Sequence, residues 1–315
     1  MQTFIIRRLL IGALILFVLS VVVFLLLRIV PGDPAVRRCG LNCKEEQIAA
    51  IRAQYGYDKS YPAQYWDWLS GVFTGDLGTS TFLQRPVLES IKARLPVTLE
   101  LMVLTLLLTI AVGIPFGVIS AIFRESPADY TVRVTAVFGL AVPAFWVATL
   151  VLILPVTWWG YAPPLGEYVK FQDDPVGNLK QFLPAAGVLA LGSAAGIMRL
   201  TRSSLLEVLR QDYMRTARAK GLRERSVIVR HALKNSMIPV VTVLGLQMAG
   251  LLGGAIIVEQ IFALPGLGEY TLLAIVNKDF DVVQTMTLYA GVTVVLLNLA
   301  VDVSYAWLDP RIRYS

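Results

Sequence analysis

The sequence contains few charged side chains. Asp, Glu, Lys and Arg together make up 16% of its 315 residues, while 56% of the residues are hydrophobic. A soluble globular domain carries about 25% charged residues. This shortage argues against an ordinary soluble fold, and no stretch between the apolar segments is long enough for a soluble domain with an active site.

Residues that catalyse reactions or bind metals are also scarce. The chain has one histidine, His231, and two cysteines, and no pair of acidic residues falls in the middle of an apolar stretch. It lacks a Gly-x4-Gly-Lys-Ser/Thr loop, the motif that cradles nucleotide phosphates. The sequence therefore predicts no catalytic, cofactor-binding or metal-ligating residue, and it argues against an intramembrane enzyme.

What the sequence does contain is six long apolar stretches. A bilayer core requires a helix of about 20 residues, and a backbone in lipid must satisfy its own hydrogen bonds. We therefore expect an all-α integral membrane protein that forms a single transmembrane domain over residues 1–315. Its six transmembrane helices are expected at about residues 9–30, 97–123, 134–157, 182–201, 236–258 and 282–307.

The basic residues predict the orientation of these helices. With the N-terminus inside, the inner segments hold 16 basic and seven acidic residues, whereas the outer segments hold 12 basic and 15 acidic residues. Cytoplasmic loops carry the excess of Lys and Arg. Both termini are therefore expected in the cytoplasm, with an outer region at residues 31–95 and a cytoplasmic loop at 202–235. The first stretch is not followed by a cleavage site of small residues, so we expect it to be retained.

The outer region contains Cys39 and Cys43, four residues apart. If this region faces an oxidising compartment, the two cysteines can form a local disulfide, and two free thiols are the alternative. A metal site is not expected, because the single histidine falls on the opposite side of the membrane.

Two short helices are expected in the same outer region. Residues 44–55 have Glu45 and Glu46 in their first turn and are followed by a stop at Gly56. Residues 62–73 begin with a proline and gather aromatic side chains on one face. Such a helix commonly lies at the membrane interface. Its aromatic face can serve packing or ligand binding.

Acidic and small residues mark further positions in the expected spans. Glu100 and Glu259 fall at outer helix ends, where we expect water to reach them, and Glu259 is a candidate for the outer mouth of a pore. Asp302, near an inner helix end, is expected to pair with a nearby arginine, such as Arg311 or Arg313. Glycines recur four residues apart, a spacing that serves close helix packing or the wall of a pore: Gly113/Gly117, Gly192/Gly196 and Gly250/Gly254.

The longest inner loop contains the basic segment Tyr213-Met-Arg-Thr-Ala-Arg-Ala-Lys-Gly221. Its residues predict a short helix over Tyr213–Lys220, with Asp212 as a possible N-cap and Gly221 as the C-terminal stop. Small side chains allow such a helix to enter a groove on an acidic partner, and its charges set the orientation. The alternative is a loop that rests on anionic lipid, which explains the charges but not the order of helix, glycine and second basic helix.

The basic segment resembles the coupling loop of permeases in binding-protein-dependent ABC importers. The general form of that loop is Glu-Ala-Ala-x3-Gly, and this chain keeps Ala217 and Gly221 but has Arg215-Thr216 in place of Glu-Ala. Pro239 lies 18 residues beyond Gly221, farther than in the general form. Both departures resemble the variant found in the peptide-permease subfamily.

Other motifs of that subfamily recur along nearly the whole chain. The resemblance is strongest to the first permease of dipeptide, oligopeptide and glutathione importers, and Cys39 and Cys43 are not part of its pattern. The motifs are Arg7-Arg8, Pro31-Gly-Asp-Pro34, Gly75-Asp-Leu-Gly78, Arg94-Leu-Pro-Val-Thr98, Asn235-Ser-Met-Ile-Pro-Val-Val241, Pro265-Gly-Leu-Gly268 and Asp309-Pro-Arg-Ile-Arg313.

The resemblance implies one half of a transport pore with the type I fold of ABC importer permeases, in the plasma (inner) membrane of a prokaryote. A second, similar permease would complete the pore, two ATPase subunits would bind ATP and Mg²⁺, and an extracytoplasmic solute-binding protein would deliver the substrate. No nucleic acid is expected as a partner. The residues expected to contact an ATPase are Arg215, Thr216, Ala217, Arg218, Ala219, Lys220 and Gly221.

The resemblance leaves the substrate open. Peptides are the default expectation, and glutathione, nickel complexes and oligosaccharides are the alternatives. A stand-alone channel or secondary transporter is the alternative of another class. It would need ion-coupling charges or interrupted helices near the middle of the membrane, and the basic inner loop would then have no task.

Overall fold

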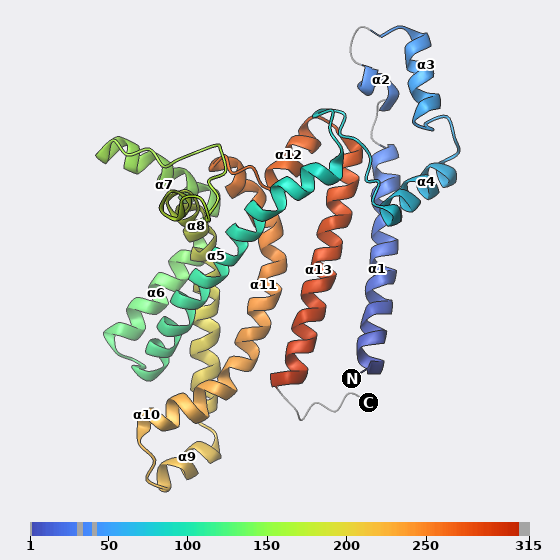
Figure 1. The fold of residues 1–315 in the computed structure, drawn as a ribbon. Coiled ribbons are helices and arrows are strands. Elements are labelled where there is room, and N and C mark those ends of the chain that lie inside the picture. The colour runs from blue at the N-terminus through green and yellow to red at the C-terminus, as the bar shows by residue number, and fades with distance from the viewer. Residues whose placement is uncertain (1, 30–33, 40–42, 309–315) are drawn as a thin grey trace. The chain divides into compact units, whose positions relative to one another are not determined.

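The computed structural model describes residues 2–29, 34–39 and 43–308, and nearly all of them are helical (Figure 1). The described residues contain no β-strand, only an isolated bridge between Thr79 and Pro86. The predicted all-α fold is therefore confirmed. Residues 309–313 and most of the Pro31-Gly-Asp-Pro34 motif lie outside the described residues, as do Arg311 and Arg313, the expected partners of Asp302.

The contacts divide the chain into two compact units, residues 1–96 with 270–295 and residues 97–269 with 296–315. In the first unit, the ends of the short helices follow from their sequences. Gly56 and Gly75 both have positive φ angles, of 65° and 83°, which glycine adopts without a steric penalty. They end the two short helices expected in the outer region. The helices that begin in this unit are α1 (Gln2–Ile29), α2 (Pro34–Cys39), α3 (Glu45–Gln54), α4 (Tyr61–Thr74) and α13 (Phe280–Leu308).

Polar contacts connect the short helices of the first unit to its long helices. Arg38 on α2 forms an ion pair with Asp281 at the start of α13. Tyr65 on α4 lies edge-on to a phenylalanine ring of α1, with 5.4 Å between the ring centroids, and its hydroxyl lies 2.8 Å from the Ser20 hydroxyl. The residues after α1 are thereby held against the same end of α1 and α13.

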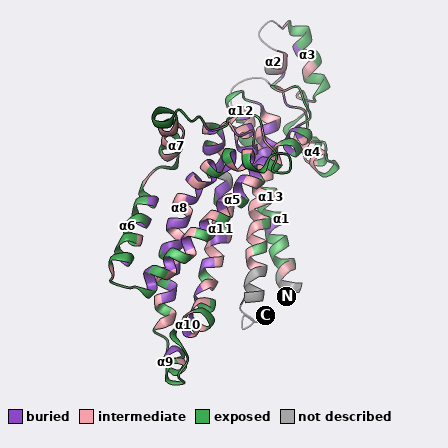
Figure 2. Cartoon of the chain, turned by 60° about the vertical axis from the view of Figure 1, so that its left-hand side comes forward, coloured by how far each residue is buried: buried purple, intermediate pink, exposed green. Residues whose placement is uncertain are grey.

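The second unit is built around α8 (Pro175–Leu209), which packs against α6, α7 and α11. Figure 2 shows buried residues along much of α8. Neighbouring helices, rather than lipid, therefore cover much of its surface, which explains why its apolar content is modest for a membrane span. The unit's other helices are most of α5 (Val87–Ile122), α6 (Pro127–Ala141), α7 (Ala144–Trp159), α9 (Asp212–Ala219), α10 (Glu224–Ser226), the π-helix η1 (Val227–Leu233) and α11 (Lys234–Ile261); α12 (Leu267–Val276) begins in this unit and ends in the first.

The third expected span is broken. Residues 134–157 were expected as one helix, but α6 and α7 meet at an angle of 98°. Pro143 explains the break, because proline lacks an N–H and disfavours helical geometry in the residue before it. Val142 accordingly adopts an extended conformation, with φ −84° and ψ 126°. Among the described residues, five helices can each cross a membrane by length and composition, or six if the bent pair counts as one span.

The paired glycines have different surroundings. A Cβ added at Gly117 on α5 would lie 2.6 Å from the Cβ of Thr201 and 2.8 Å from the Met198 carbonyl oxygen, so α5 and α8 are in backbone contact there. A Cβ added at Gly250 would meet no atom within 4 Å. The spacing therefore marks close packing in α5, but not at Gly250.

Candidate coupling site

The basic inner segment forms the short helix α9, which ends as its sequence predicts. Gly221 follows the helix with a φ of 76°, and its N–H donates to the carbonyl oxygen of Arg218 at 2.9 Å. This left-handed glycine stops the helix. The start differs from the prediction by one residue: Gln211 occupies the N-cap position, and Asp212 is the first helical residue. There Asp212 still interacts favourably with the helix dipole.

One side of α9 is buried against the rest of the second unit. Met214 is fully buried and belongs to an apolar cluster with Leu205 of α8, Ala121 of α5 and Val227 of η1. Ala217, one turn later, packs at the edge of this cluster. This cluster joins α9 to η1 and to the ends of α5 and α8.

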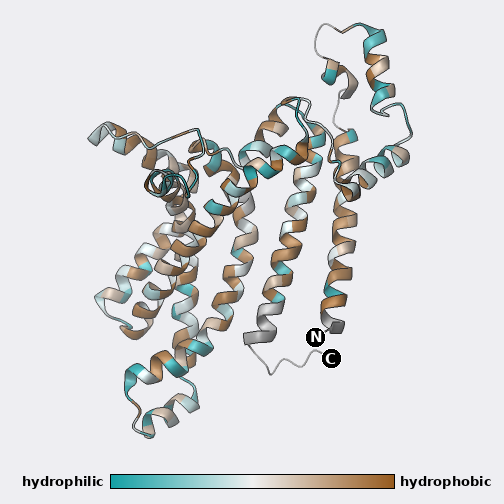
Figure 3. Ribbon diagram, viewed as in Figure 1, coloured by the Kyte–Doolittle hydropathy of each residue, from teal (hydrophilic) through white to brown (hydrophobic). Residues whose placement is uncertain are grey.

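The opposite side of α9 is exposed and basic. Arg215, Thr216, Arg218, Ala219, Lys220 and Gly221 are all exposed, so six of the seven residues expected to contact a partner are accessible, and Ala217 is half-buried. Figure 3 shows this polar segment at the end of the apolar helices of the same unit.

The charges of α9 are partly paired within the chain. Arg218 donates two hydrogen bonds to Glu224, at 2.9 and 3.1 Å, and this pairing raises the pKa of Arg218. Arg215 lies 3.5 Å from Asp212, and both side chains are largely exposed. Exposed pairs contribute only about 0–1 kcal/mol, so a partner carboxylate can replace either acid.

The helix that follows the basic loop is continuous with the fifth span. The α10, η1 and α11 segments follow one another directly from Glu224 to Ile261, and Pro239 lies inside α11 rather than at its start. Asn235 donates a hydrogen bond of 3.0 Å to the Tyr213 hydroxyl, which connects α9 to α11. The loop therefore reaches the span through one uninterrupted helical element.

A buried ion pair at the start of α6 was not foreseen from the sequence. Asp129 is fully buried and accepts hydrogen bonds from Arg202 Nε at 2.8 Å, Arg202 Nη2 at 3.0 Å, Ser120 Oγ at 2.5 Å and the Glu125 N–H at 3.0 Å. These donors come from α5, α8 and the turn between α5 and α6. Asp129 and Arg202 are 73 residues apart in the sequence, and no local sequence pattern connects them.

The expectation for Glu259 was wrong. Its side chain is fully buried rather than reached by water. One carboxylate oxygen accepts a hydrogen bond from the Thr98 hydroxyl at 2.8 Å, and the other accepts from the Glu269 N–H at 3.0 Å. The signal in the sequence was the Pro265-Gly-Leu-Gly268 motif, because a side chain at Gly266 would overlap this carboxyl group.

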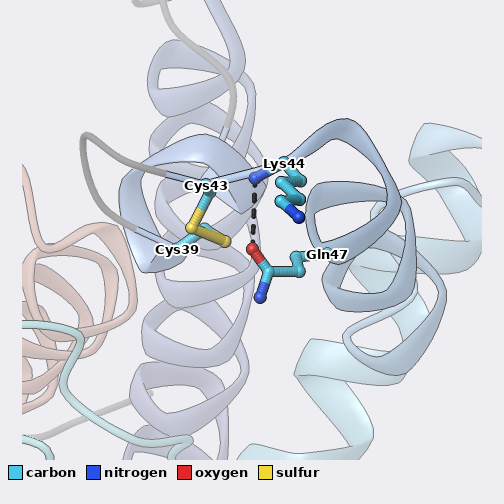
Figure 4. The surroundings of a disulfide bond; sticks show 4 residues. All are labelled: Cys39, Cys43, Lys44 and Gln47. Carbon is cyan, nitrogen blue, oxygen red and sulfur yellow. Dashed lines mark hydrogen bonds between the residues drawn. A yellow bond between two sulfur atoms is a disulfide. The ribbon is translucent and has the colours of Figure 1, made fainter.

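Cys39 at the end of α2 and Cys43 before α3 are joined by a disulfide, with their Cα atoms 5.7 Å apart (Figure 4). Just beyond it, the N–H of Lys44 donates a hydrogen bond of 3.1 Å to Gln47 Oε1 in the first turn of α3. The disulfide therefore connects α2 to the start of α3 in the first unit.

Replacing both cysteines by serine is expected to leave transport intact and to destabilise the protein by at most about 2 kcal/mol, because the closed loop is short. Alkylation followed by mass spectrometry checks the bond itself. Both cysteines should take up label only after reduction, and full labelling without reductant would contradict the disulfide.

Comparison with known proteins decides the family. Residues 113–314 match the family described as the binding-protein-dependent transport system inner membrane component, and residues 1–102 match the N-terminal part of such membrane components. The chain belongs to this family.

Relatives match this permease over its full length. A Brucella abortus (strain 2308) permease protein, provisionally named for peptide transport, is 41% identical, and the oligopeptide transport system permease protein AppB of Bacillus subtilis (strain 168) is 38% identical; each match covers all of both chains. A solved structure of the MetNI methionine ABC transporter shares the fold, with a TM-score of 0.57 and 18% identity over 70% of the permease and 96% of that chain.

Family membership confirms the main predictions made from the sequence. The chain is the inner membrane component of an ABC importer, a permease rather than an enzyme. Importers of this family depend on a solute-binding protein and on ATPase subunits, which are separate from the permease.

Proposed function

We propose that this permease forms half of the pore of a peptide importer and that α9 is its contact with an ATPase. The exposed basic side of α9, fixed by Met214 to α5 and α8, supports the proposal. The substrate is proposed from relatives at 41% and 38% identity that are named for peptide and oligopeptide transport. In this arrangement α9 and both termini face the cytoplasm, and α2, α3 and α4 face outward.

The proposed mechanism follows from how α9 is held. Two partner ATPases bind ATP and Mg²⁺, and each receives the coupling helix of one permease in a groove. Closure of the ATPases moves α9, and the buried Met214 cluster and the Asn235–Tyr213 hydrogen bond transmit the motion to α5, α8 and α11. The two ATPase states must bind α9 with different affinity, because a partner that binds both pore states equally shifts nothing.

Reversing two charges on α9 tests this contact. The double variant Arg218→Glu and Lys220→Glu is expected to reduce peptide uptake to background, because it repels an acidic groove. Uptake into cells or proteoliposomes is the measurement, together with co-purification of the ATPase subunits. Arg210→Glu, an exposed position before α9, is the matched control and should retain uptake.

Gly221→Pro provides a second variant with no change of charge. Proline is restricted to a φ of about −65°, whereas Gly221 requires 76°, so the end of α9 must rearrange. Normal uptake by both variants, at normal membrane levels, would show that α9 does not couple the ATPases to the pore.

The alternative of another class, a stand-alone channel or secondary transporter, is opposed by the family match, although the break between α6 and α7 resembles an interrupted helix. The purified chain in liposomes separates the two. A secondary transporter moves solute without partners, whereas the proposed subunit is inert without ATPases. Competition of peptide uptake by glutathione, a nickel complex or an oligosaccharide tests the substrate.

A further inference from the structure

A basic cavity lies between α6 and α8 in the second unit. Its volume is about 640 Å³. Three of its described lining residues are arginines, Arg133 on α6 and Arg199 and Arg202 on α8, and none of the described lining residues is acidic. Because an arginine side chain stays protonated in a protein, the lining of this cavity carries three positive charges.

Only one of these three charges is neutralised within the described part of the chain. Arg202 pairs with the buried Asp129 through two N–H groups, and 23% of its side chain remains exposed. Arg133 and Arg199 are exposed and form no ion pair with a described residue. The Arg133 guanidinium lies 5.6 Å from the centroid of the Tyr130 ring, a contact that neutralises no charge. The cavity therefore has an excess of two positive charges.

The same cavity is apolar on its other side. Arg133 directly precedes the uncharged stretch 134–157, and Arg199 directly follows the uncharged stretch 182–198. Such positions fall at the boundary between the hydrocarbon core and the head groups of a bilayer. Val137, one turn into the first stretch, also lines the cavity and is 61% exposed. The cavity is thus basic at the level of the head groups and apolar toward the hydrocarbon core.

We propose that this cavity binds an anionic phospholipid, with its phosphate between Arg133 and Arg199 and an acyl chain along Val137. Guanidinium and phosphate groups form charge-assisted, often bidentate hydrogen bonds. Basic pockets between membrane helices on the cytoplasmic side suit anionic head groups, and in the proposed orientation this end of α6 and α8 lies in the cytoplasmic leaflet. A free phosphate ion would use only the basic side of the cavity, whereas a lipid uses both sides.

Titration of a short-chain phosphatidylglycerol onto the purified importer complex in detergent, followed by native mass spectrometry, tests the site. Phosphatidylglycerol should bind at least about fivefold more tightly than phosphatidylcholine of the same chain length, which has no net charge. Arg133→Gln and Arg199→Gln should each weaken phosphatidylglycerol binding by about fivefold, because a basic residue beside anionic lipid contributes about 1 kcal/mol. Both side chains are exposed, so these variants should fold, whereas Arg202 is left unchanged because it holds Asp129.

Arg210→Gln is the matched control, because it removes the same charge from an exposed position that directly follows α8 and does not line the cavity. It should leave lipid binding unchanged. Equal binding of the two lipids, or unchanged binding after both substitutions together, would overturn the proposal.

Two competitors identify other occupants. Displacement of phosphatidylglycerol by inorganic phosphate at the same concentration would show a site for a free anion, and displacement by the dipeptide Ala-Ala would assign the cavity to the substrate path. Either result, or a failure of the assembled complex to bind lipid, contradicts the lipid site. Peptide uptake is not part of this measurement, so the lipid site and the proposed function can fail independently.

Discussion

Asp129→Ala is expected to destabilise the second unit by about 3 kcal/mol, the lower end of the cost of breaking a buried ion pair. The substitution removes the acceptor of four hydrogen bonds and leaves Arg202 uncompensated. We choose the lower end because 23% of the Arg202 side chain remains exposed, so water can solvate part of its charge. Thermal unfolding of the purified protein is the measurement.

Two further variants make this prediction specific. Glu125→Gln breaks the exposed pair between Arg124 and Glu125 in the same turn, and it should change stability by less than about 1 kcal/mol. Adding Arg202→Leu to Asp129→Ala should recover part of the loss, because an apolar side chain carries no unpaired charge. Equal stability of Asp129→Ala and Glu125→Gln would show that the pair contributes little.

Gly266→Ala is expected to have a comparable effect at the junction of α11 and α12. The added methyl group would overlap the Glu259 carboxyl group, which is buried and cannot move into solvent. Overpacking of this kind costs about 1–3 kcal/mol. A displaced carboxylate also leaves the Thr98 hydroxyl and the Glu269 N–H without an acceptor, at about 1–3 kcal/mol each. Thermal unfolding again gives the measurement.

Gly250→Ala is the matched control, because the same methyl group meets no atom within 4 Å on α11. It should be neutral or slightly stabilising, because alanine is more favourable than glycine inside a helix by about 1 kcal/mol. Glu259→Gln tests the hydrogen bonds without a change of size. Each carboxylate oxygen of Glu259 accepts a hydrogen bond, so in the glutamine variant the NH₂ group must face either the Thr98 hydroxyl or the Glu269 N–H. If Gly266→Ala and Gly250→Ala unfold at the same temperature, the close packing around Glu259 is not needed for stability.

Much of the fold could be predicted because membrane helices depend on local composition. A run of apolar residues long enough to cross a bilayer forms a helix whatever its neighbours are. The ends of α3 and α9 were equally local, because Gly56 and Gly221 adopt backbone angles that other residues avoid. The break at Pro143 was readable in principle, but hydropathy alone joined α6 and α7 into one span.

By itself, the sequence determined the all-α membrane class, the family and the position of the basic helix α9, because composition, motif spacing and glycine positions are properties of short segments. Only the tertiary structure decided that Asp129 meets Arg202 and that Glu259 is enclosed by Thr98 and the turn at Gly266. Those groups come from helices far apart in the chain. Whether a polar side chain is exposed, paired or left without a partner depends on which helices pack around it.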